Sequence, residues 1–347
     1  MTTDISRLSA GLQQILDDAV AAGEETGCQL AIFDRGTPVI NLAAGNGITT
    51  DTLFPVFSAG KGLMTTAVHR LVERGVLSYD TRVADLWPEF GCNGKEDVRV
   101  WHILTHRSGL HQLPAVNAPE EQADWKLMCD RIAAMKPVWT PGTKCEYQGI
   151  TYAWLLGEVA QRADGRDFRR IVTEEVLAPL GLEHHFFFGT ARPYAAPALT
   201  LCPGEEPPWA AQFIGCDAIR HGLVPSANGL GTAYALARHY AALKHDIDGV
   251  RLLRPETVAN ATFLRRAADD PAGETWAKFG LGYALCGPEP EVGRMFGHGG
   301  ALGAEGLADK QTGLAIGFTK NQVTPTHPVH PVRDRISRLL GLPVRHW

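Results

Sequence analysis

The chain has 347 residues, of which 45% are hydrophobic and 20% are charged, the composition of an ordinary globular protein. This length is enough for one large core or two lobes. The 33 basic and 38 acidic residues give a formal net charge of -5, which offers no electrostatic reason to expect nucleic acid or an anionic membrane as a partner, so we expect a small-molecule substrate.

Leader, membrane and cysteine signals point to the cytoplasm. The first residues, MTTDISRLSAGLQQ, lack a basic stretch followed by an apolar one, and no window approaches the roughly 18 uninterrupted apolar residues of a membrane span. The cysteines form no C-x-x-C pair, which favours reduced and buried thiols over a disulfide framework. They are Cys28, Cys92, Cys129, Cys145, Cys202, Cys216 and Cys286.

The amino-terminal part predicts a helix followed by a hairpin. Apolar residues recur at three- and four-residue steps from Ile5 to Val20, and Gly23 follows as a stop signal. The segment 28–45 then alternates around a D-R-G break, which is typical of two antiparallel strands. A further helical pattern runs from Ser58 to Gly75.

Helices and loops predominate in the middle of the chain. Helical periodicity covers 122–135, 151–165, 167–182 and 232–245. Between the last two lies a Pro- and Gly-rich passage, 187–231, whose aromatic residues favour an ordered loop that could pack over a site.

Short strand patterns return after residue 275 and cover 279–286, 294–300, 304–309 and 313–321, before a closing helix from Val332 to Leu340. Strands at both ends predict an α/β (α+β) fold with one antiparallel sheet built from both termini and flanked by helices. We expect a discontinuous sheet lobe, 1–65 and 270–347, a mainly helical inserted lobe, 66–269, and an active site in the cleft between them.

The stretch VFSAGKGLMTT contains Ser58 and, three residues later, Lys61, which would share one face of a helix. Of the seven serines, only Ser58 has a lysine at this spacing. A serine where a strand gives way to a helix can use unpaired N–H groups and the positive end of the helix dipole. The alternative is a helix N-cap, Ser58, beside a solvated lysine.

Two later motifs carry further candidates. Tyr147 follows a Pro-Gly turn, and a nearby ammonium such as that of Lys61 would lower its pKa from about 10 towards neutrality, so that the phenol could act as a base. The alternative is a packed tyrosine with a satisfied hydroxyl. In FGHGGALGAEG, His298 precedes glycines that let a backbone edge approach a ligand, or that merely mark a bulge.

Together these motifs resemble the serine β-lactamase and penicillin-binding-protein superfamily, and most closely the class C-like branch with carboxylesterases (family VIII) and D-aminopeptidases. The resemblance covers nearly the whole chain. The segments that carry it are FPVFSAGKGLMTTAVHRLVERGVLSYDTRVADLWPEF, VRVWHILTHRSGL, PVWTPGTKCEYQGITYAWLLGEVAQRADG, VLAPLGLEHHFF, FGLGYALC and GHGGALGAEG.

The resemblance implies a β-lactamase/transpeptidase-like fold and a role for each matching residue. Ser58 would be the acylated nucleophile, Lys61 the amine that activates it, and Tyr147 the general base. His298 would stand in the catalytic strand motif, and the oxyanion hole would use the N–H groups of Ser58 and Ala301. The substrate-binding positions would be Gly149, Gly299 and Gly300.

Two departures from the family pattern bear on the substrate. Lactam-active relatives have Y-x-N where this chain has Tyr147-Gln148-Gly149, and K-T-G where it has His298-Gly299-Gly300. The missing amide makes efficient β-lactam hydrolysis unexpected, and the histidine would be a weak, largely neutral donor in place of a charged lysine. An uncharged ester, or an amide without a free carboxylate, fits better.

Other histidines are assigned to loops. His106 and His111 flank Ser108, but a triad is assembled by folding rather than by sequence neighbours, and no G-x-S-x-G surrounds any serine. His327 and His330 lack a metal-binding pattern around them. We therefore predict no metal and no cofactor.

The sequence thus predicts a cytoplasmic serine hydrolase, a carboxylesterase that works through an acyl-enzyme on small-molecule substrates. The alternatives are an acyltransferase that uses the same intermediate, a D-amino-acid amidase or peptidase, residual lactamase activity, and a non-enzymatic scaffold on the same fold.

Overall fold

The computed structural model describes residues 2–189, 216–265, 278–287, 292–322 and 331–344. Much of the passage 187–231, together with Cys202, His327 and His330, lies outside these residues.

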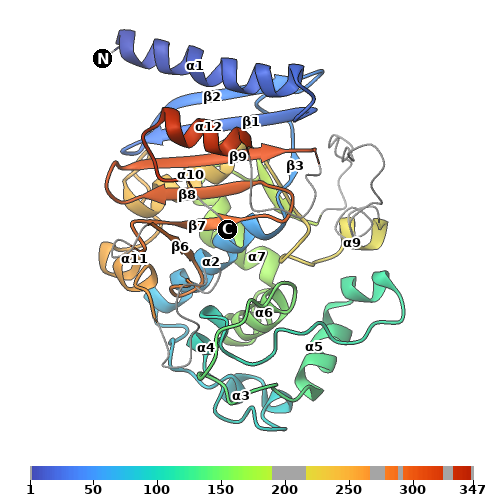
Figure 1. Ribbon diagram of the computed structural model, residues 1–347. Helices are drawn as coiled ribbons and strands as arrows, with labels where there is room; N and C mark the ends of the chain where they lie inside the picture. The colour runs from blue at the N-terminus through green and yellow to red at the C-terminus, as the bar shows by residue number, and fades with distance from the viewer. Residues whose placement is uncertain (1, 190–215, 266–277, 288–291, 323–330, 345–347) are drawn as a thin grey trace.

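The main sheet is antiparallel and has the order β2-β1-β9-β8-β7-β6 (Figure 1). It confirms the prediction that the first hairpin and the last strands form one sheet, because β1 pairs with β2 on one side and with β9 on the other. The strands are β1 (Gly27–Asp34), β2 (Thr37–Gly45), β6 (Ala284–Cys286), β7 (Met295–Gly299), β8 (Glu305–Asp309) and β9 (Leu314–Lys320).

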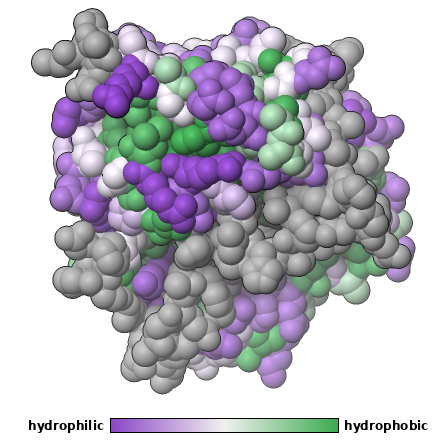
Figure 2. All heavy atoms as spheres, turned by 45° about the horizontal axis from the view of Figure 1, so that its top comes forward, coloured by the Kyte–Doolittle hydropathy of each residue, from purple (hydrophilic) through white to green (hydrophobic). Residues whose placement is uncertain are grey.

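Helices cover both faces of this sheet, which explains why β1 is buried along nearly its whole length. On one face Leu12 and Leu16 of α1 (Thr2–Ala21) pack with Leu30, Phe318 and Ile336, the last from α12 (Pro331–Leu339). On the other face α10 (Ala233–Lys244) packs against β9, β1 and β8. Figure 2 shows the α1 side of the surface, where one hydrophobic area is bordered by hydrophilic residues.

The helical part lies beyond α10, on the side of β7 and β6 (Figure 1). Its core joins α2 to the helices around it through fully buried residues such as Leu63, Trp154 and Phe168. The predicted helices over 122–135, 151–165 and 232–245 are confirmed by α5 (Trp125–Ala134), α6 (Thr151–Asp164) and α10. The other helices of this part are α2 (Lys61–Glu73), α3 (Val83–Leu86), α4 (Val100–Leu104), α7 (Phe168–Val172), α9 (Asp217–His221) and α11 (Pro255–Ala261). The two-lobe division with its boundaries stays a prediction.

The segment 167–182 is helical but not one regular α-helix. After α7 the pitch widens to a π turn over Thr173–Leu177 and then tightens to a 3-10 turn over Ala178–Leu180. Pro179 has no N–H to continue an α-helical ladder, and Gly181 ends the segment with φ +65°.

A second, three-stranded sheet was not predicted. It pairs β5 (Gly229–Gly231) with β3 (Phe54–Pro55) and β4 (Phe186–Phe188). Strands of two or three residues carry no alternation that a sequence pattern could reveal. Val56, directly after β3, donates its N–H to Gly229 O at 2.9 Å, so this small sheet holds the chain just before Ser58.

Six cysteines of the described residues carry free thiols, and Cys28, Cys129 and Cys145 are buried, in agreement with the prediction for them. Within the described segments, we find no helix with the length and apolar character needed to cross a membrane. The described residues also contain no group of three or more His, Cys, Asp and Glu side chains placed to hold a metal ion.

The packing of α10 on the sheet depends on Gly317 of β9. A Cβ there would lie 2.0 Å from Ala233 O and 2.8 Å from Ala237 N, both backbone atoms of α10. We expect Gly317→Ala to lower the free energy of unfolding by about 3 kcal/mol, because the helix would have to move off the sheet. Urea denaturation followed by circular dichroism measures this change.

The matched control is Gly11→Ala in α1. Its Cβ would approach only the flexible Leu339 side chain, at 3.3 Å, and alanine favours a helix. This variant is expected to be as stable as the wild type or slightly more stable. Equal stability of the two variants would contradict the packing argument.

Candidate active site

Ser58 lies in a 3-10 turn, Phe57–Gly60, between the small sheet and α2. Phe57 has φ +48°, an unfavourable backbone conformation for a bulky residue, and its side chain is buried. Such strain persists only where the surrounding structure enforces it. The Ser58 side chain is left partly exposed, so a substrate can reach it.

The N-cap alternative for Ser58 is wrong. The residue at the N-cap of α2 is Gly60, and no side chain caps that helix. Instead Ser58 Oγ lies 2.7 Å from Lys61 Nζ and 3.5 Å from the carbonyl oxygen of Ser226. Lys61 is not solvated either, since its side chain is fully buried.

The Lys61 amine has only uncharged hydrogen-bond partners among the described residues. Nζ hydrogen-bonds to Ser58 Oγ and donates to Ser226 O at 3.2 Å, and none of its partners among the described residues is a carboxylate. Burial lowers the pKa of Lys61 well below its ordinary value. Burial therefore favours the neutral amine, whose lone pair can accept the proton of the Ser58 hydroxyl.

Tyr147 joins the same site, with an electrostatic state opposite to the predicted one. Lys61 Nζ lies 5.1 Å from the centre of the Tyr147 ring. Burial raises the pKa of Tyr147, although the neighbouring Ser58 side chain opposes the rise, so the expectation of a phenol acidified by Lys61 is wrong for the resting site. An ammonium–phenolate pair would require two buried charges, and burial disfavours both.

The Tyr147 hydroxyl is buried and has no hydrogen-bond partner of acceptable geometry among the described residues. Its ring stacks on Phe279, with centroids 5.8 Å apart and planes 7° apart, and packs at 5.0 Å against His106. The Ser58 side chain is the polar neighbour of this hydroxyl, so Tyr147 is packed in the core and also faces the candidate nucleophile.

His298 on β7 completes the group, with its ring centre 5.9 Å from that of Tyr147. Its Nδ1 lies 2.7 Å from Gly299 O, and because a carbonyl oxygen only accepts, Nδ1 carries the hydrogen. Burial lowers the pKa of His298 to about 3, so the ring is neutral as expected. Nε2 therefore carries a lone pair and is a hydrogen-bond acceptor, not the donor predicted from the sequence.

The end of β7 is pressed against the segment before Ser58. A Cβ at Gly300 would lie 2.2 Å from Val56 O, so only glycine fits there. Gly300 N–H donates to Ala304 O at 2.7 Å, and Ala301 begins the turn that leads to β8. The structure thus brings Gly299, Gly300 and Ala301 beside the backbone that carries the candidate nucleophile.

The segment after Tyr147 has room for a larger residue. A Cβ at Gly149 would meet only Tyr147 Cε1, at 3.8 Å, an ordinary contact. Gln148, which sequence reasoning did not single out, is fully buried, and neither atom of its amide has a partner among the described residues. Its backbone N–H donates to His106 Nδ1 at 3.2 Å.

The serine flanked by histidines forms no triad. Ser108 is fully buried, and its Oγ accepts the Leu110 N–H at 3.2 Å. His106 faces Tyr147, while His111 stacks on Trp139 with centroids 5.0 Å apart. These contacts agree with the prediction that this stretch is a structural loop.

Ser226 was also missed, and its contribution comes largely from the backbone. Its carbonyl holds the Lys61 amine, and its Oγ accepts the Ala153 N–H in the first turn of α6 at 3.0 Å. No side-chain motif could have revealed a functional carbonyl.

Known proteins resemble this chain over most of its length. The Beta-lactamase family model matches residues 12–340. Esterase/beta-lactamase LipL of Mycobacterium tuberculosis is 30% identical over 345 residues, covering 86% of this chain and 77% of that protein. A crystal structure of a family VIII carboxylesterase matches with a TM-score of 0.84 and 26% identity, and a penicillin-binding-protein homologue from Caulobacter crescentus with 0.77 and 31%; each match covers 96% of both chains.

The pH dependence of Ser58 reactivity distinguishes the two candidate bases. If neutral Lys61 takes the proton, the rate of Ser58 labelling by a fluorophosphonate will rise with pH through the lowered pKa of Lys61 and then level off. The midpoint is expected well below about 10.4, the ordinary lysine value. Mass spectrometry of the Ser58 peptide, after labelling at a series of pH values, measures it.

Tyr147→Phe is the control, because it should slow labelling without moving the midpoint. A midpoint above about 10, lost in Tyr147→Phe, would assign the proton to the phenol instead.

Proposed function

Since the chain belongs to the β-lactamase family, we propose that it is a serine hydrolase that cleaves carboxylic esters through a covalent acyl-enzyme. The observation that carries the proposal is the Ser58 Oγ–Lys61 Nζ distance of 2.7 Å, with the amine fully buried and without a carboxylate partner in the described part of the chain. The printed name of LipL includes esterase, and the matched carboxylesterase structure supports the same chemistry.

In the first step Ser58 Oγ attacks the carbonyl carbon of the ester while its proton moves to Lys61 Nζ. The resulting ammonium is stabilised by Ser226 O and by the face of the Tyr147 ring. We assign the oxyanion to the N–H groups of Ser58 and Ala301, as the family resemblance implies.

Collapse of this intermediate needs a proton for the departing alkoxide. Next to the new ammonium the Tyr147 phenol becomes more acidic, gives its proton to the alkoxide and regains one from Lys61. In the second half of the cycle water attacks the acyl carbonyl carbon while neutral Lys61 accepts its proton; the bond from the acyl carbon to Ser58 Oγ then breaks, and Lys61 returns that proton to Ser58 Oγ. Tyr147 is thus a proton carrier between substrate and Lys61.

The charges of the site favour an uncharged substrate. His298 is neutral and offers a lone pair, so a substrate carboxylate would find no cation there. Gly149 has no side-chain amide that could hydrogen-bond to an acylamide group of the substrate. We place the substrate between the sheet and the helical part. The free thiols of the described cysteines suit a reducing compartment, so we place the protein in the cytoplasm.

Loss of the nucleophile tests the assignment. Ser58→Ala is expected to reduce hydrolysis of p-nitrophenyl butyrate by at least about 1,000-fold, and Tyr147→Phe to reduce kcat strongly with little change in KM. Release of p-nitrophenol measures both. Ser108→Ala is the matched control and should keep its activity; full activity of Ser58→Ala would exclude the mechanism.

The preference for neutral esters is tested at His298. His298→Lys restores a cation in this position, and we expect it to raise kcat/KM for p-nitrophenyl hemisuccinate relative to p-nitrophenyl butyrate by about tenfold or more. Steady-state kinetics with both esters gives the ratio. An unchanged ratio would remove His298 from the substrate contact, while leaving the Ser58 chemistry in place.

A further inference from the structure

The hydroxyl of Tyr147 does not fix the position of its own ring. In the resting site it has no hydrogen-bond partner of acceptable geometry among the described residues, although the Ser58 side chain is its polar neighbour. A proton carrier must nevertheless come within about 2.6–3.2 Å of the atoms that exchange the proton. The position of Tyr147 therefore depends on the backbone that carries it and on the rings that pack against it.

One residue, His106, binds the backbone on both sides of Tyr147. The Glu146 N–H donates to the carbonyl oxygen of His106 at 3.0 Å. The Gln148 N–H donates to Nδ1 of the His106 ring at 3.2 Å. The chain is thus held by a single residue immediately before and immediately after the candidate proton carrier.

The ring of His106 also packs against Tyr147 itself. Its centre lies 5.0 Å from that of Tyr147 and 4.3 Å from that of Phe279, the ring that stacks on Tyr147. His106 is only 1% exposed, so water does not compete for these contacts. Backbone and side-chain contacts of one buried residue therefore restrict how the Tyr147 ring can move.

These contacts require a neutral histidine ring with a lone pair on Nδ1. Burial lowers the pKa of His106 well below its ordinary value, so the ring is neutral. Because Nδ1 accepts the Gln148 N–H, the single ring hydrogen is on Nε2. In a charged ring both nitrogens are donors, and the bond to Gln148 would be lost.

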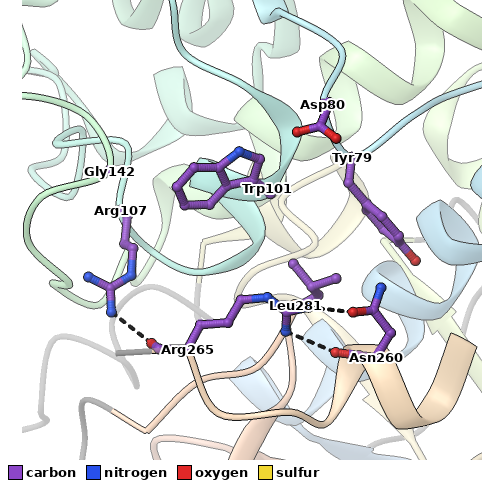
Figure 3. Close-up of a pocket in the computed structure, with 8 residues that line it drawn as sticks. All are labelled: Tyr79, Asp80, Trp101, Arg107, Gly142, Asn260, Arg265 and Leu281. Atoms are coloured by element: carbon purple, nitrogen blue, oxygen red, sulfur yellow. Dashed lines mark hydrogen bonds between the residues drawn. The ribbon is translucent and has the colours of Figure 1, made fainter. Parts of the chain in front are cut away.

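The loop that carries His106 is anchored by its own backbone bonds. The Arg107 N–H donates to His102 O at 2.7 Å, and Arg107 O accepts the Gly142 N–H at 2.9 Å. Arg107 and Gly142 also line a cavity of about 600 Å³, whose lining does not include Tyr147 (Figure 3). His106 has φ +57°, a left-handed conformation that His and Asn adopt more often than most residues. The anchored loop thus presents the His106 carbonyl and ring to the Tyr147 segment.

We propose that His106 is a positioning residue that holds the Tyr147 phenol at the place required for proton transfer to the leaving group. This role rests on the proposed function, because it takes Tyr147 as the proton carrier of ester cleavage. Since His106 acts through Tyr147, its loss is expected to matter most when the leaving group requires a proton.

The test compares two esters that share an acyl group and differ in the leaving group. p-Nitrophenolate departs from p-nitrophenyl butyrate without a proton, whereas the ethoxide of ethyl butyrate requires one. We define the leaving-group ratio as kcat/KM for ethyl butyrate divided by kcat/KM for p-nitrophenyl butyrate. Titration of the released butyric acid at constant pH and absorbance of p-nitrophenol measure the two values.

His106→Leu and His106→Asn are the matched variants, because the two side chains have nearly the same shape and only asparagine keeps an acceptor at the position of Nδ1. We expect His106→Leu to lower the leaving-group ratio about tenfold and His106→Asn to keep it within about threefold of the wild type. In Tyr147→Phe the ratio is already low, and adding His106→Leu should not lower it further.

The control from the same loop is His111→Leu. The His111 ring stacks on Trp139 with centroids 5.0 Å apart, and this variant should leave the leaving-group ratio unchanged. Melting curves establish that each variant is folded. If His106→Leu does not fold, His106→Phe is used in its place, because it keeps a buried ring and lacks the acceptor.

Equal losses for both esters in His106→Leu would overturn the role of His106. So would a further fall of the ratio when His106→Leu is added to Tyr147→Phe, or a ratio in His106→Asn as low as that in His106→Leu. Failure of the wild type to hydrolyse ethyl butyrate would also overturn it, because Tyr147 would then deliver no proton to an alkoxide. Ester hydrolysis that persists in Ser58→Ala would instead exclude the proposed function.

Discussion

The proposed chemistry of this protein depends on burying one amine, that of Lys61, without a carboxylate partner in the described part of the chain. A charged ammonium at the position of Lys61 would lack water and would lack a carboxylate among its described partners, and the effective penalty for such a burial is several kcal/mol. The neutral form removes that penalty and leaves a lone pair 2.7 Å from Ser58 Oγ. A single physical condition, burial, therefore favours the base form of this lysine. It also explains why Tyr147 stays protonated, since no permanent cation stands beside it to stabilise a phenolate.

The fold maintains this condition by close approaches that exclude water. A Cβ at Gly62, the residue after Lys61, would lie 2.1 Å from Tyr240 Oη, and one at Gly60 would lie 2.8 Å from Phe188 Cε1. The glycines bring α10 and the small sheet directly against the start of α2, while Gly300 brings β7 against Val56. Phe57 is held at φ +48° within this packing, at a cost of about 1–3 kcal/mol. Since the surrounding core enforces the strained turn, Ser58 and Lys61 keep their mutual orientation without a ligand.

Periodicity was sufficient to predict the main elements but not the site's electrostatics. The first helix, the hairpin and the late strands follow from apolar spacing, and strand patterns at both ends of the chain predicted one sheet built from both termini, in which the structure pairs β1 with β9. The small sheet was not predicted because its strands have only two or three residues, too few to show an alternating pattern. Ser58 and Lys61 were found because their contact is encoded in a three-residue spacing. The carbonyl of Ser226, the tautomer of His298 and the direction of the Tyr147 pKa shift were not, because each depends on burial and on backbone atoms brought together only by folding.

The resting site also holds hydrogen-bonding groups that the described residues leave unpaired. The Tyr147 hydroxyl, His298 Nε2 and the Gln148 amide are buried without partners there. Each such group costs about 1–3 kcal/mol relative to a satisfied one. Natural proteins rarely leave several unsatisfied atoms so close to one another unless another molecule pairs with them. Here the unpaired set offers a donor at Tyr147 and an acceptor at His298, next to a nucleophile and a neutral base. A polar but uncharged substrate would hydrogen-bond to both groups without introducing a charge that the site cannot balance. The unpaired groups and the uncharged form of Lys61 therefore favour the same kind of substrate.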